Sequence, residues 1–463
     1  MLMGFFMPFI FRVRHAVAHS LLMWFFILKV LLTLLFVEIV LISVFVNVKI
    51  HKLDFILIVL TFKIFDMKKI LVIIIGAVSM ACLSSAFLVK EKPAAHLNAA
   101  QIDATLNKSI IKYKTLAHNT ADSLYPRTIV DGKVKFVDMY DWTSGFFPAS
   151  LWYLYQFSKD AELKKLADKS TRTLEPLKYY SGTHDLGFMI YCPHGLAYSI
   201  TADPYYKNVF LKTSQTLITR YNKNAKCIRS WDHGAWQFPV IIDNMMNLEM
   251  LMESFKISGD SNLYKVAVAH SNTTLKNHFR DDFSSFHLVD YDTITGAVIK
   301  KQTVQGFSDP SAWARGQAWA FYGYLTMYRE TKNPLYLKQS IGIAKFFMSH
   351  PNLPADAIPY WDFNASGIPN EPRDVAAAAI FASGLMELSE YVKDNQQYIS
   401  FAEKVLLSLS SDKYFNADNE NFGFLLKHAT GHKPNKSEID VPLNYADYYF
   451  IEALLRFKKH LNK

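Results

Sequence analysis

One short run of charged and aromatic residues, Trp313-Ala314-Arg315-Gly316-Gln317-Ala318-Trp319, is the stretch whose chemistry is easiest to interpret. The apolar, aromatic sequence after it predicts a helix, whose first turn Asp309 or Ser311 could cap. Arg315 and Trp319 are four residues apart, so they share one helix face. A guanidinium fork beside an indole suits a planar, anionic, ring-shaped ligand. An arginine–carboxylate pair next to a core tryptophan fits the same residues, and this run alone leaves both interpretations open.

Two other runs each place an aspartate next to apolar residues. They are His184-Asp185-Leu186-Gly187-Phe188 and Ile241-Ile242-Asp243-Asn244-Met245-Met246-Asn247. A buried carboxylate needs a partner or a raised pKa. We therefore interpret Asp185 and Asp243 as functional, although Asp243 also fits a helix-start carboxylate on the helix dipole. His287, taken alone, fits a core histidine.

The elements that must position these residues are helices arranged in pairs. Short turns rich in Asn, Asp, Gly and Pro join an aromatic-rich helix to a more polar one, as in Ser258-Gly259-Asp260. The first helix of each pair is apolar on most faces and the second is amphipathic, which predicts an inner and an outer layer. Six pairs predict an all-α fold, an α/α six-barrel with six inner and six outer helices, and an open solenoid is the alternative. The twelve predicted helical segments are 99–119, 147–157, 160–177, 187–201, 204–222, 240–257, 260–279, 312–330, 333–349, 372–393, 395–411 and 442–460.

The unusual residues gather where the inner helices begin. In a barrel these helix starts meet at one end, which we call the mouth, and helix N-termini there favour an anion. The predicted mouth residues are Trp142, Asp185, Asp243, Arg315 and Trp319, with Trp231, Trp236, His287 and Gln305 added by loops. The sequence therefore predicts one site at one end of the barrel.

The net charge of +9 comes largely from the N-terminal region. Of the 50 basic and 41 acidic residues, ten and four lie in residues 1–98, which leaves 40 and 37 for the remainder. No basic run marks this nearly neutral part, so the composition argues against nucleic-acid binding. Only Cys192 and Cys227 follow the leader, and two cysteines make neither a metal motif nor a disulfide framework.

The pattern of the first 98 residues is typical of targeting segments. Leu21 to Val48 is nearly continuous apolar sequence, long enough to span a bilayer. Met67-Lys68-Lys69 begins a second pattern of a basic start, an apolar run and small residues, typical of a signal peptide. We interpret 1–66 as an upstream translation artefact or a membrane anchor, 67–98 as a signal peptide with a short linker, and 99–463 as the catalytic domain. Export to the periplasm follows, with Cys82 as a possible lipid-anchor site.

The two aspartate runs and the Trp-Ala-Arg-Gly-Gln-Ala-Trp run, in this order and spacing, resemble the unsaturated glucuronyl hydrolases. The resemblance covers residues 100 to 460. It implies the α/α six-barrel and a substrate with a 4,5-unsaturated uronic acid at its non-reducing end, as polysaccharide lyases produce. It implies hydration of the vinyl ether, with Asp243 as general acid and base and Asp185 as the second essential aspartate. The residues that match the family's substrate pocket are Trp142, Trp231, His287, Gln305, Arg315 and Trp319.

Several alternatives stay open from the sequence. An unsaturated rhamnogalacturonyl hydrolase and an inverting glycosidase also use two carboxylates, and a non-catalytic helical glycan-binding protein would need the aromatic residues without the aspartates. We expect no cofactor and no metal, an unsaturated glycosaminoglycan oligosaccharide as the partner, and membrane contact only through the leader or a lipid anchor. The sequence gives no oligomeric state.

Overall fold

The computed structural model describes residues 96–417 and 420–463. The expectations about the leader, the apolar run and Cys82 lie outside these residues. Among the described helices, none is both long enough and apolar enough to cross a membrane.

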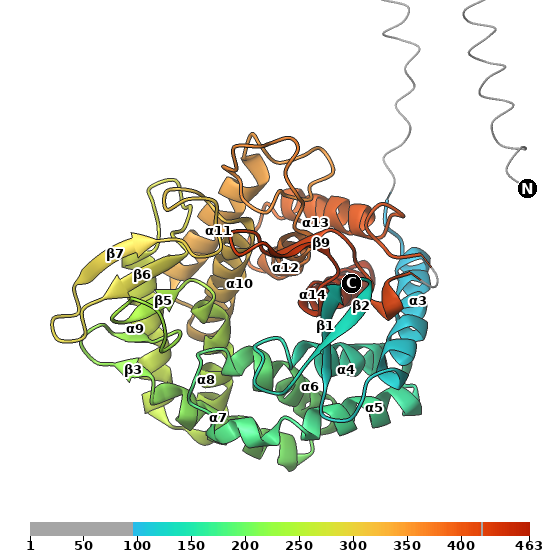
Figure 1. Cartoon of the computed structure of the whole chain (residues 1–463), viewed down its shortest axis with the longest axis horizontal. Coiled ribbons are helices and arrows are strands. Elements are labelled where there is room, and N and C mark those ends of the chain that lie inside the picture. The colour runs from blue at the N-terminus through green and yellow to red at the C-terminus, as the bar shows by residue number, and fades with distance from the viewer. Residues whose placement is uncertain (1–95, 418–419) are drawn as a thin grey trace, which may run out of the picture. The chain divides into compact units, whose positions relative to one another are not determined.

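The described residues form twelve α-helices, one for each predicted helical segment. The inner helices are α4 (Phe146–Ser158), α6 (Cys192–Thr201), α8 (Asn244–Ser258), α10 (Ala314–Thr331), α12 (Val375–Leu388) and α14 (Asn444–Leu461). The outer helices are α3 (Ala99–His118), α5 (Ala161–Arg172), α7 (Pro204–Ile218), α9 (Ser261–Asn277), α11 (Pro334–Ser349) and α13 (Gln396–Leu409). Each inner helix packs against the next, except that α8 is contacted by η2 (Gly187–Tyr191), the short helical segment that leads into α6, and α14 packs against α4 to close the ring (Figure 1). The α/α six-barrel is therefore confirmed and the open solenoid is excluded.

The two helix layers differ in burial as their sequences predict. Every residue of α12 is buried, and so is α10 from Ala314 to Met327. In α5, by contrast, only Leu163, Ala167 and Thr171 are buried. Removal of apolar side chains from water is the main favourable term in folding, and most of it lies in the inner layer.

Four of the predicted turns share one geometry. The inner helix ends at a residue with positive φ, and the next residue is an Asp or Asn that caps the outer helix. Examples are Lys159 before Asp160 and Gly259, at φ 74°, before Asp260. The fifth turn differs, because Asn395 begins α13 without a side-chain cap. These turns lie at the end of the barrel opposite the mouth.

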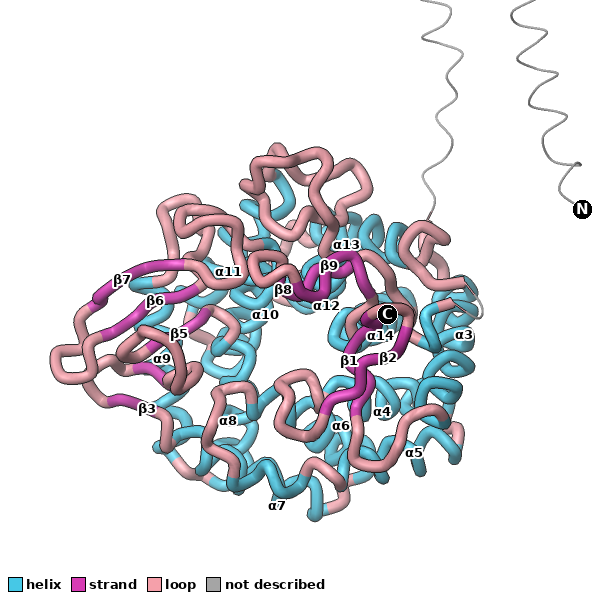
Figure 2. Tube along the Cα trace, in the orientation of Figure 1, coloured by secondary structure: helices cyan, strands magenta, loops and turns pink. Residues whose placement is uncertain are grey.

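The mouth is surrounded by antiparallel strands and loops, which Figure 2 shows around the opening of the ring. The strands and short helical turns are β1 (Tyr125–Val130), β2 (Lys133–Val137), η1 (Glu175–Tyr179), η2 (Gly187–Tyr191), β3 (Tyr221–Asn222), β4 (Cys227–Ile228), β5 (Pro239–Ile241), β6 (Leu288–Tyr291), β7 (Val298–Gln302), η3 (Asn421–Gly423), β8 (Ala429–His432) and β9 (Ser437–Val441). The β1–β2 and β8–β9 hairpins and the β5–β6–β7 sheet are the strand pairs that reach the site.

Two details of the helix starts differ from prediction. The helix expected from residue 240 begins at Asn244, because Pro239–Ile241 pairs as a strand with β6. The helix expected from 312 begins at Ala314 after Trp313, without a side-chain cap. Ser311 donates its hydroxyl to Asp362 instead, and Asp309 accepts the N–H of Thr303. Both differences come from strand and loop hydrogen bonds that helical periodicity does not encode.

Candidate active site

A cavity of about 450 Å³ opens at the mouth. It is lined from several inner-helix starts and from the loops and hairpins around them. Its lining residues are Arg127, Trp142, His184, Asp185, Trp231, His233, Trp236, Ile241, Asp243, His287, Val304, Gln305, Arg315, Gly431, His432, Asn435, Glu438 and Tyr445. Seven of the eight predicted site residues are therefore brought together. No group of three or more His, Cys, Asp or Glu side chains within residues 96–417 and 420–463 is placed to hold a metal ion.

The three-stranded sheet β5–β6–β7 delivers three of these residues from one edge. Ile241 pairs with Leu288, and Leu288 pairs with Gln302. Asp243 follows β5, His287 immediately precedes β6, and Gln305 follows β7. Because neighbouring strands run antiparallel, the end of β5, the start of β6 and the end of β7 lie at the same edge. The sheet thus gathers residues from three separate parts of the sequence.

Asp243 is the least satisfied carboxyl of the cavity. The residue is 7% exposed, and its Oδ2 atom has no hydrogen-bond partner among the described residues. It occupies the N-cap position of α8, as the helix-start interpretation expects, but its side chain makes no capping hydrogen bond. Burial raises the pKa of Asp243 to about 7, the positive charge of Arg315 lowers it, and the negative charge of Asp185 raises it further. The Asp243 carboxyl is therefore protonated in a large fraction of molecules near pH 7.

His287 presents a fixed proton toward Asp243. Its Nδ1 accepts the backbone N–H of Val304 at 3.0 Å. Burial lowers the pKa of His287 to about 3, so the ring is neutral and its single proton is on Nε2. That Nε2 lies 3.9 Å from Asp243 Oδ2, too far for a direct hydrogen bond, and has no other partner in the described part of the chain. One donor and one carboxyl oxygen, both on residues that line the cavity, therefore lie next to each other.

Asp185 lies where η2 begins and is held from its own loop. The Thr183 hydroxyl donates to Asp185 Oδ2 at 2.9 Å, and His184 Nε2 lies 3.2 Å from Oδ1. Burial lowers the pKa of His184, so this ring is also neutral. The π-helical geometry of η2 is frequent at functional sites.

Gly187 explains the glycine of the first aspartate run. A Cβ at Gly187 would lie 2.7 Å from the Cα of Asn247, so only glycine allows this approach. The Asn247 side-chain oxygen then accepts the N–H of Phe188 at 3.2 Å. This contact joins the segment after Asp185 to α8, the helix that Asp243 precedes.

Arg315 lines the cavity, but its fork is mostly occupied. Nη1 donates to Asp374 Oδ2 and to the Thr430 carbonyl, both at 2.6 Å, and Nη2 donates to the Gly431 carbonyl at 2.6 Å. Only Nε lacks a partner among the described residues. The arginine–carboxylate pair left open from the sequence is therefore present, and the same guanidinium holds the β8–β9 hairpin over the mouth.

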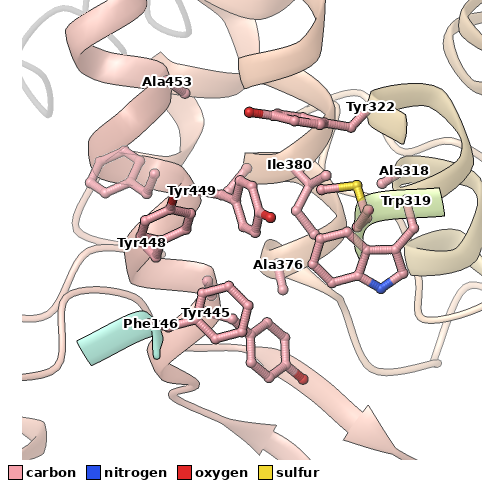
Figure 3. Close-up of a cluster of buried hydrophobic side chains, with 14 of the residues drawn as sticks. Phe146, Ala318, Trp319, Tyr322, Ala376, Ile380, Tyr445, Tyr448, Tyr449 and Ala453 are labelled. Atoms are coloured by element: carbon pink, nitrogen blue, oxygen red, sulfur yellow. The ribbon is translucent and has the colours of Figure 1, made fainter. Parts of the chain in front are cut away.

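Trp319 is the one predicted site residue outside the cavity. It is fully buried, with ring centroids 5.1 Å from Phe188 and 5.4 Å from Tyr449. Figure 3 shows its indole within the buried cluster that includes Tyr322 and Tyr449. Its expected place facing a ligand is wrong, because one helical turn carries Trp319 about 5.4 Å further into the barrel than Arg315.

Trp142 and Trp231 supply aromatic surface to the cavity, as expected. The Trp142 ring lies 4.9 Å from Tyr445 and 5.7 Å from Phe188. The Trp231 ring stacks on His233 at 5.6 Å, and its Nε1 has no partner among the described residues. Flat apolar faces with a polar edge suit a sugar ring.

Sequence reasoning missed Arg127 and the residues of the β8–β9 hairpin. Arg127, on β1, donates from Nε and Nη2 to Glu438 at 2.6 and 2.8 Å, and from Nη1 to Asp141 at 2.5 Å. It thereby ties the turn before Trp142 to the hairpin that carries His432. A lone arginine in a strand-like stretch gave no signal, since its partner carboxylates lie 14 and 311 residues away.

Comparison with known proteins gives one consistent family. No protein-family model matches the chain. An unsaturated glucuronyl hydrolase of Formosa agariphila is 48% identical over 354 residues, which cover 75% of this chain and 87% of the relative. An unsaturated chondroitin disaccharide hydrolase of Streptococcus agalactiae is 32% identical over 336 residues, with 70% and 83% covered.

Solved structures agree with these relatives. The crystal structure of an unsaturated glucuronyl hydrolase specific for heparin is 44% identical, with a TM-score of 0.78, and the match covers 79% of this chain and 99% of that one. The unsaturated glucuronyl hydrolase of Bacillus sp. GL1 gives a TM-score of 0.72 at 26% identity, covering 77% and 97%. With the barrel and the two aspartates in place, the resemblance seen in the sequence is confirmed, and the chain belongs to the unsaturated glucuronyl hydrolase family.

Proposed function

We propose that this enzyme removes the 4,5-unsaturated glucuronic acid from the non-reducing end of lyase-produced glycosaminoglycan oligosaccharides by hydrating the C4=C5 double bond. The observation that carries the assignment is Asp243. Asp243 lines the cavity, its Oδ2 atom is buried and has no partner within the described residues, and the pKa of its carboxyl is raised to about 7. A group that must first donate a proton and then accept one works best with a pKa near the operating pH.

Asp243 acts first as the acid. Its proton goes to C4 of the vinyl ether, and the positive charge that develops at C5 is shared with the ring oxygen. Burial of Asp243 keeps the acid form populated until the pH exceeds about 7. An ordinary aspartic acid would be almost entirely ionised at that pH and could not donate.

Asp243 then acts as the base. A water molecule adds to C5, and the carboxylate of Asp243 takes up a proton from that water, which restores the acid. The resulting hemiketal opens to a ketone at C5 and leaves a hemiacetal at C1. Collapse of the hemiacetal to an aldehyde releases the reducing-side sugar, so that one water is consumed and Asp243 returns to its starting state.

The remaining cavity residues orient the substrate in this proposal. His287 Nε2–H donates to an oxygen held beside Asp243, since it lies 3.9 Å from Oδ2 with no partner of its own among the described residues. The free Nε–H of Arg315 and the amide of Gln305 suit the uronate carboxylate. Trp142 and Trp231 flank the sugar ring. The negative charge of Asp185 raises the pKa of Asp243 and so helps to keep Asp243 protonated.

The experiment follows the ultraviolet absorbance of the unsaturated uronate. Unsaturated disaccharides from chondroitin, hyaluronan and heparin are mixed with the enzyme, and loss of the absorbance together with release of the neighbouring sugar is expected. Cleavage of saturated substrates would indicate an ordinary glycosidase, and binding without spectral change would indicate a glycan-binding protein. Either result would overturn the proposal.

Export of the enzyme is a separate proposal. It is supported by the basic start, apolar run and small residues from Met67 onward, all outside the described residues. Fractionation of cells that express the full chain tests it, and the periplasm is the expected location. A Cys82→Ala variant distinguishes a lipid anchor, which it would abolish, from simple cleavage of the leader, which it would leave intact.

A further inference from the structure

Two tyrosines in contact lie on the loops beside the cavity. Tyr140 is 54% exposed and Tyr180 is half-buried, with ring centroids 5.1 Å apart at 69°. Tyr140 lies between β2 and α4, and Tyr180 lies between η1 and η2. Neither lines the cavity, and nothing in the mechanism above uses them.

Short chain connections place this pair at the cavity rim. Tyr140 immediately precedes Asp141, which pairs with the cavity-lining Arg127, and two residues later comes Trp142. Successive Cα atoms are about 3.8 Å apart, so Tyr140 lies within roughly 8 Å of Trp142. On the other loop, Thr183, three residues after Tyr180, donates to Asp185. The pair therefore bridges the loops that carry Trp142 and Asp185.

Local contacts order the Tyr180 ring and the turn that carries Tyr140. A Cβ at Gly182 would lie 2.4 Å from the Tyr180 hydroxyl, so the Tyr180 ring lies against this glycine. The backbone N–H of Tyr140 donates to Asp138 at 2.9 Å, which fixes the turn. A surface that is ordered in advance loses less entropy when it binds a ligand.

We propose that Tyr140 and Tyr180 form an outer subsite that packs against the sugar rings beyond the terminal disaccharide unit of the substrate. The proposal rests on the proposed function. A cavity of about 450 Å³ is toward the smaller end of ligand sites and suits a ligand of disaccharide size. Further sugars of a longer oligosaccharide then lie over the rim, where the apolar face of a sugar meets a tyrosine ring and its hydroxyls meet the phenol oxygen.

The test compares unsaturated hyaluronan disaccharide with unsaturated hyaluronan tetrasaccharide in the full-length enzyme. For Tyr140→Ala and Tyr180→Ala, the ratio of kcat/KM for tetrasaccharide to that for disaccharide should fall about 3- to 10-fold, as expected for loss of one aromatic contact. Tyr140→Phe keeps the ring and should keep most of the ratio. Because the readout is a ratio, any loss common to both substrates cancels.

Tyr179→Ala is the matched control. Tyr179 is 66% exposed and adjacent in sequence, but its ring lies near Lys178 and Lys212, away from Tyr140. An unchanged ratio in both alanine variants, or an equal fall in Tyr179→Ala, would overturn the subsite. Failure of the wild-type enzyme to hydrate the disaccharide would instead overturn the proposed function, so the two failures are distinguishable.

Discussion

Helix starts at the two ends of the barrel differ in whether a side chain caps them. Five of the six outer helices begin with a side-chain cap, such as Asp203 on α7 and Asp260 on α9. Five of the six inner helices begin without one, including α8, which follows Asp243. The exception is α12, whose cap Asp374 also pairs with Arg315. This count covers the described residues, which include all twelve helices.

The capped outer starts contribute to stability, whereas the uncapped inner starts lie near the cavity that we propose binds the substrate. At the outer starts, a short polar side chain satisfies backbone N–H groups of the first turn. Near the inner starts, by contrast, three buried polar atoms of cavity-lining residues have no partner within the described residues, namely Asp243 Oδ2, His287 Nε2 and Arg315 Nε. Unsatisfied buried groups cost stability unless a ligand completes them. We therefore expect these polar atoms near the mouth to form hydrogen bonds with the substrate.

A raised pKa alone does not identify the functional carboxyl. Burial raises the pKa of Asp447 to about 7, the same value as for Asp243. Asp447, however, accepts the N–H groups of Leu425 and Leu426 and the hydroxyl of Tyr113, and it does not line the cavity. Asp243 differs because it lines the cavity and its Oδ2 has no partner among the described residues, in addition to its raised pKa.

The largest expected effect comes from Asp243→Asn. Asn is nearly isosteric but can neither donate an acidic proton to C4 nor accept one from water. General acid–base assistance contributes about 10² to 10⁴-fold, so kcat should fall by at least about 10²-fold. Asp260→Asn is the matched control at an outer start, where Asn caps equally well and kcat should be unchanged. A folded Asp243→Asn enzyme with more than about a tenth of wild-type kcat would contradict the assignment.

The same substitution should change how stability depends on pH. The folded pKa of Asp243 is raised from 3.8 to about 7, so the folded state binds the proton more tightly than the unfolded state. Wild-type stability attributable to this group is full below pH about 4 and is lost as the pH rises toward 7. The Asn variant lacks this loss, so its advantage in unfolding free energy should grow over that interval, up to about 4 kcal/mol. Urea unfolding at pH 4, 6 and 8 measures it, and a constant difference would exclude the raised pKa.

Asp185→Asn should have the next largest effect. The negative charge of Asp185 raises the pKa of Asp243, so its removal lowers that pKa and moves the alkaline limb of kcat to lower pH. Burial is the larger cause, so the limb should remain well above the ordinary range for aspartate. We expect kcat to fall about 10²-fold, the low end for acid–base assistance. A pH–rate profile measures both kcat and the position of its alkaline limb. An alkaline limb at the wild-type pH would show that Asp185 does not raise the pKa of Asp243.

How much of this site the sequence could predict depends on the kind of contact. The convergence of Asp185, Asp243 and Arg315 was predictable, since each is next to an inner-helix start and a barrel brings those starts together. The β5–β6–β7 sheet was not, because β5 is three residues hidden in an apolar run that also fits a helix. Nor was the clamp of Arg127 on Glu438, which depends on pairing across 311 residues.

Arg315→Lys should have a moderate effect on substrate binding. Lys keeps the positive charge but loses the planar fork that reaches the carbonyls of Thr430 and Gly431. Lys also has no counterpart of the Nε–H that we propose binds the uronate carboxylate, and loss of that one charge-assisted hydrogen bond predicts a KM increase of about tenfold, with a smaller effect on kcat. The alkaline limb should stay in place, because the charge that lowers the Asp243 pKa is retained. Arg315→Gln removes the positive charge that lowers the pKa of Asp243, so it should move the alkaline limb to higher pH. An unchanged KM in Arg315→Lys would show that the guanidinium fork contributes nothing to substrate binding.

The smallest effect on activity is expected at an outer start, from Asp260→Ala. Asp260 accepts the N–H of Asn262 at 3.0 Å and the Gln215 amide at 2.8 Å, and both hydrogen bonds lower its pKa. Loss of a cap typically costs about 0.5–2 kcal/mol, so the midpoint of urea unfolding should fall while kcat and KM stay at wild-type values. Because the folded pKa is lowered, the part of this loss due to the ionised carboxylate is present above the ordinary pKa of aspartate and disappears as the pH falls through the folded value. At pH 8, Asp243→Asn should therefore be more stable than the wild type and Asp260→Ala less stable. Only Asp243→Asn should lose activity. A loss of activity in Asp260→Ala beyond its loss of folded enzyme would show that the two ends of the barrel are coupled rather than separate.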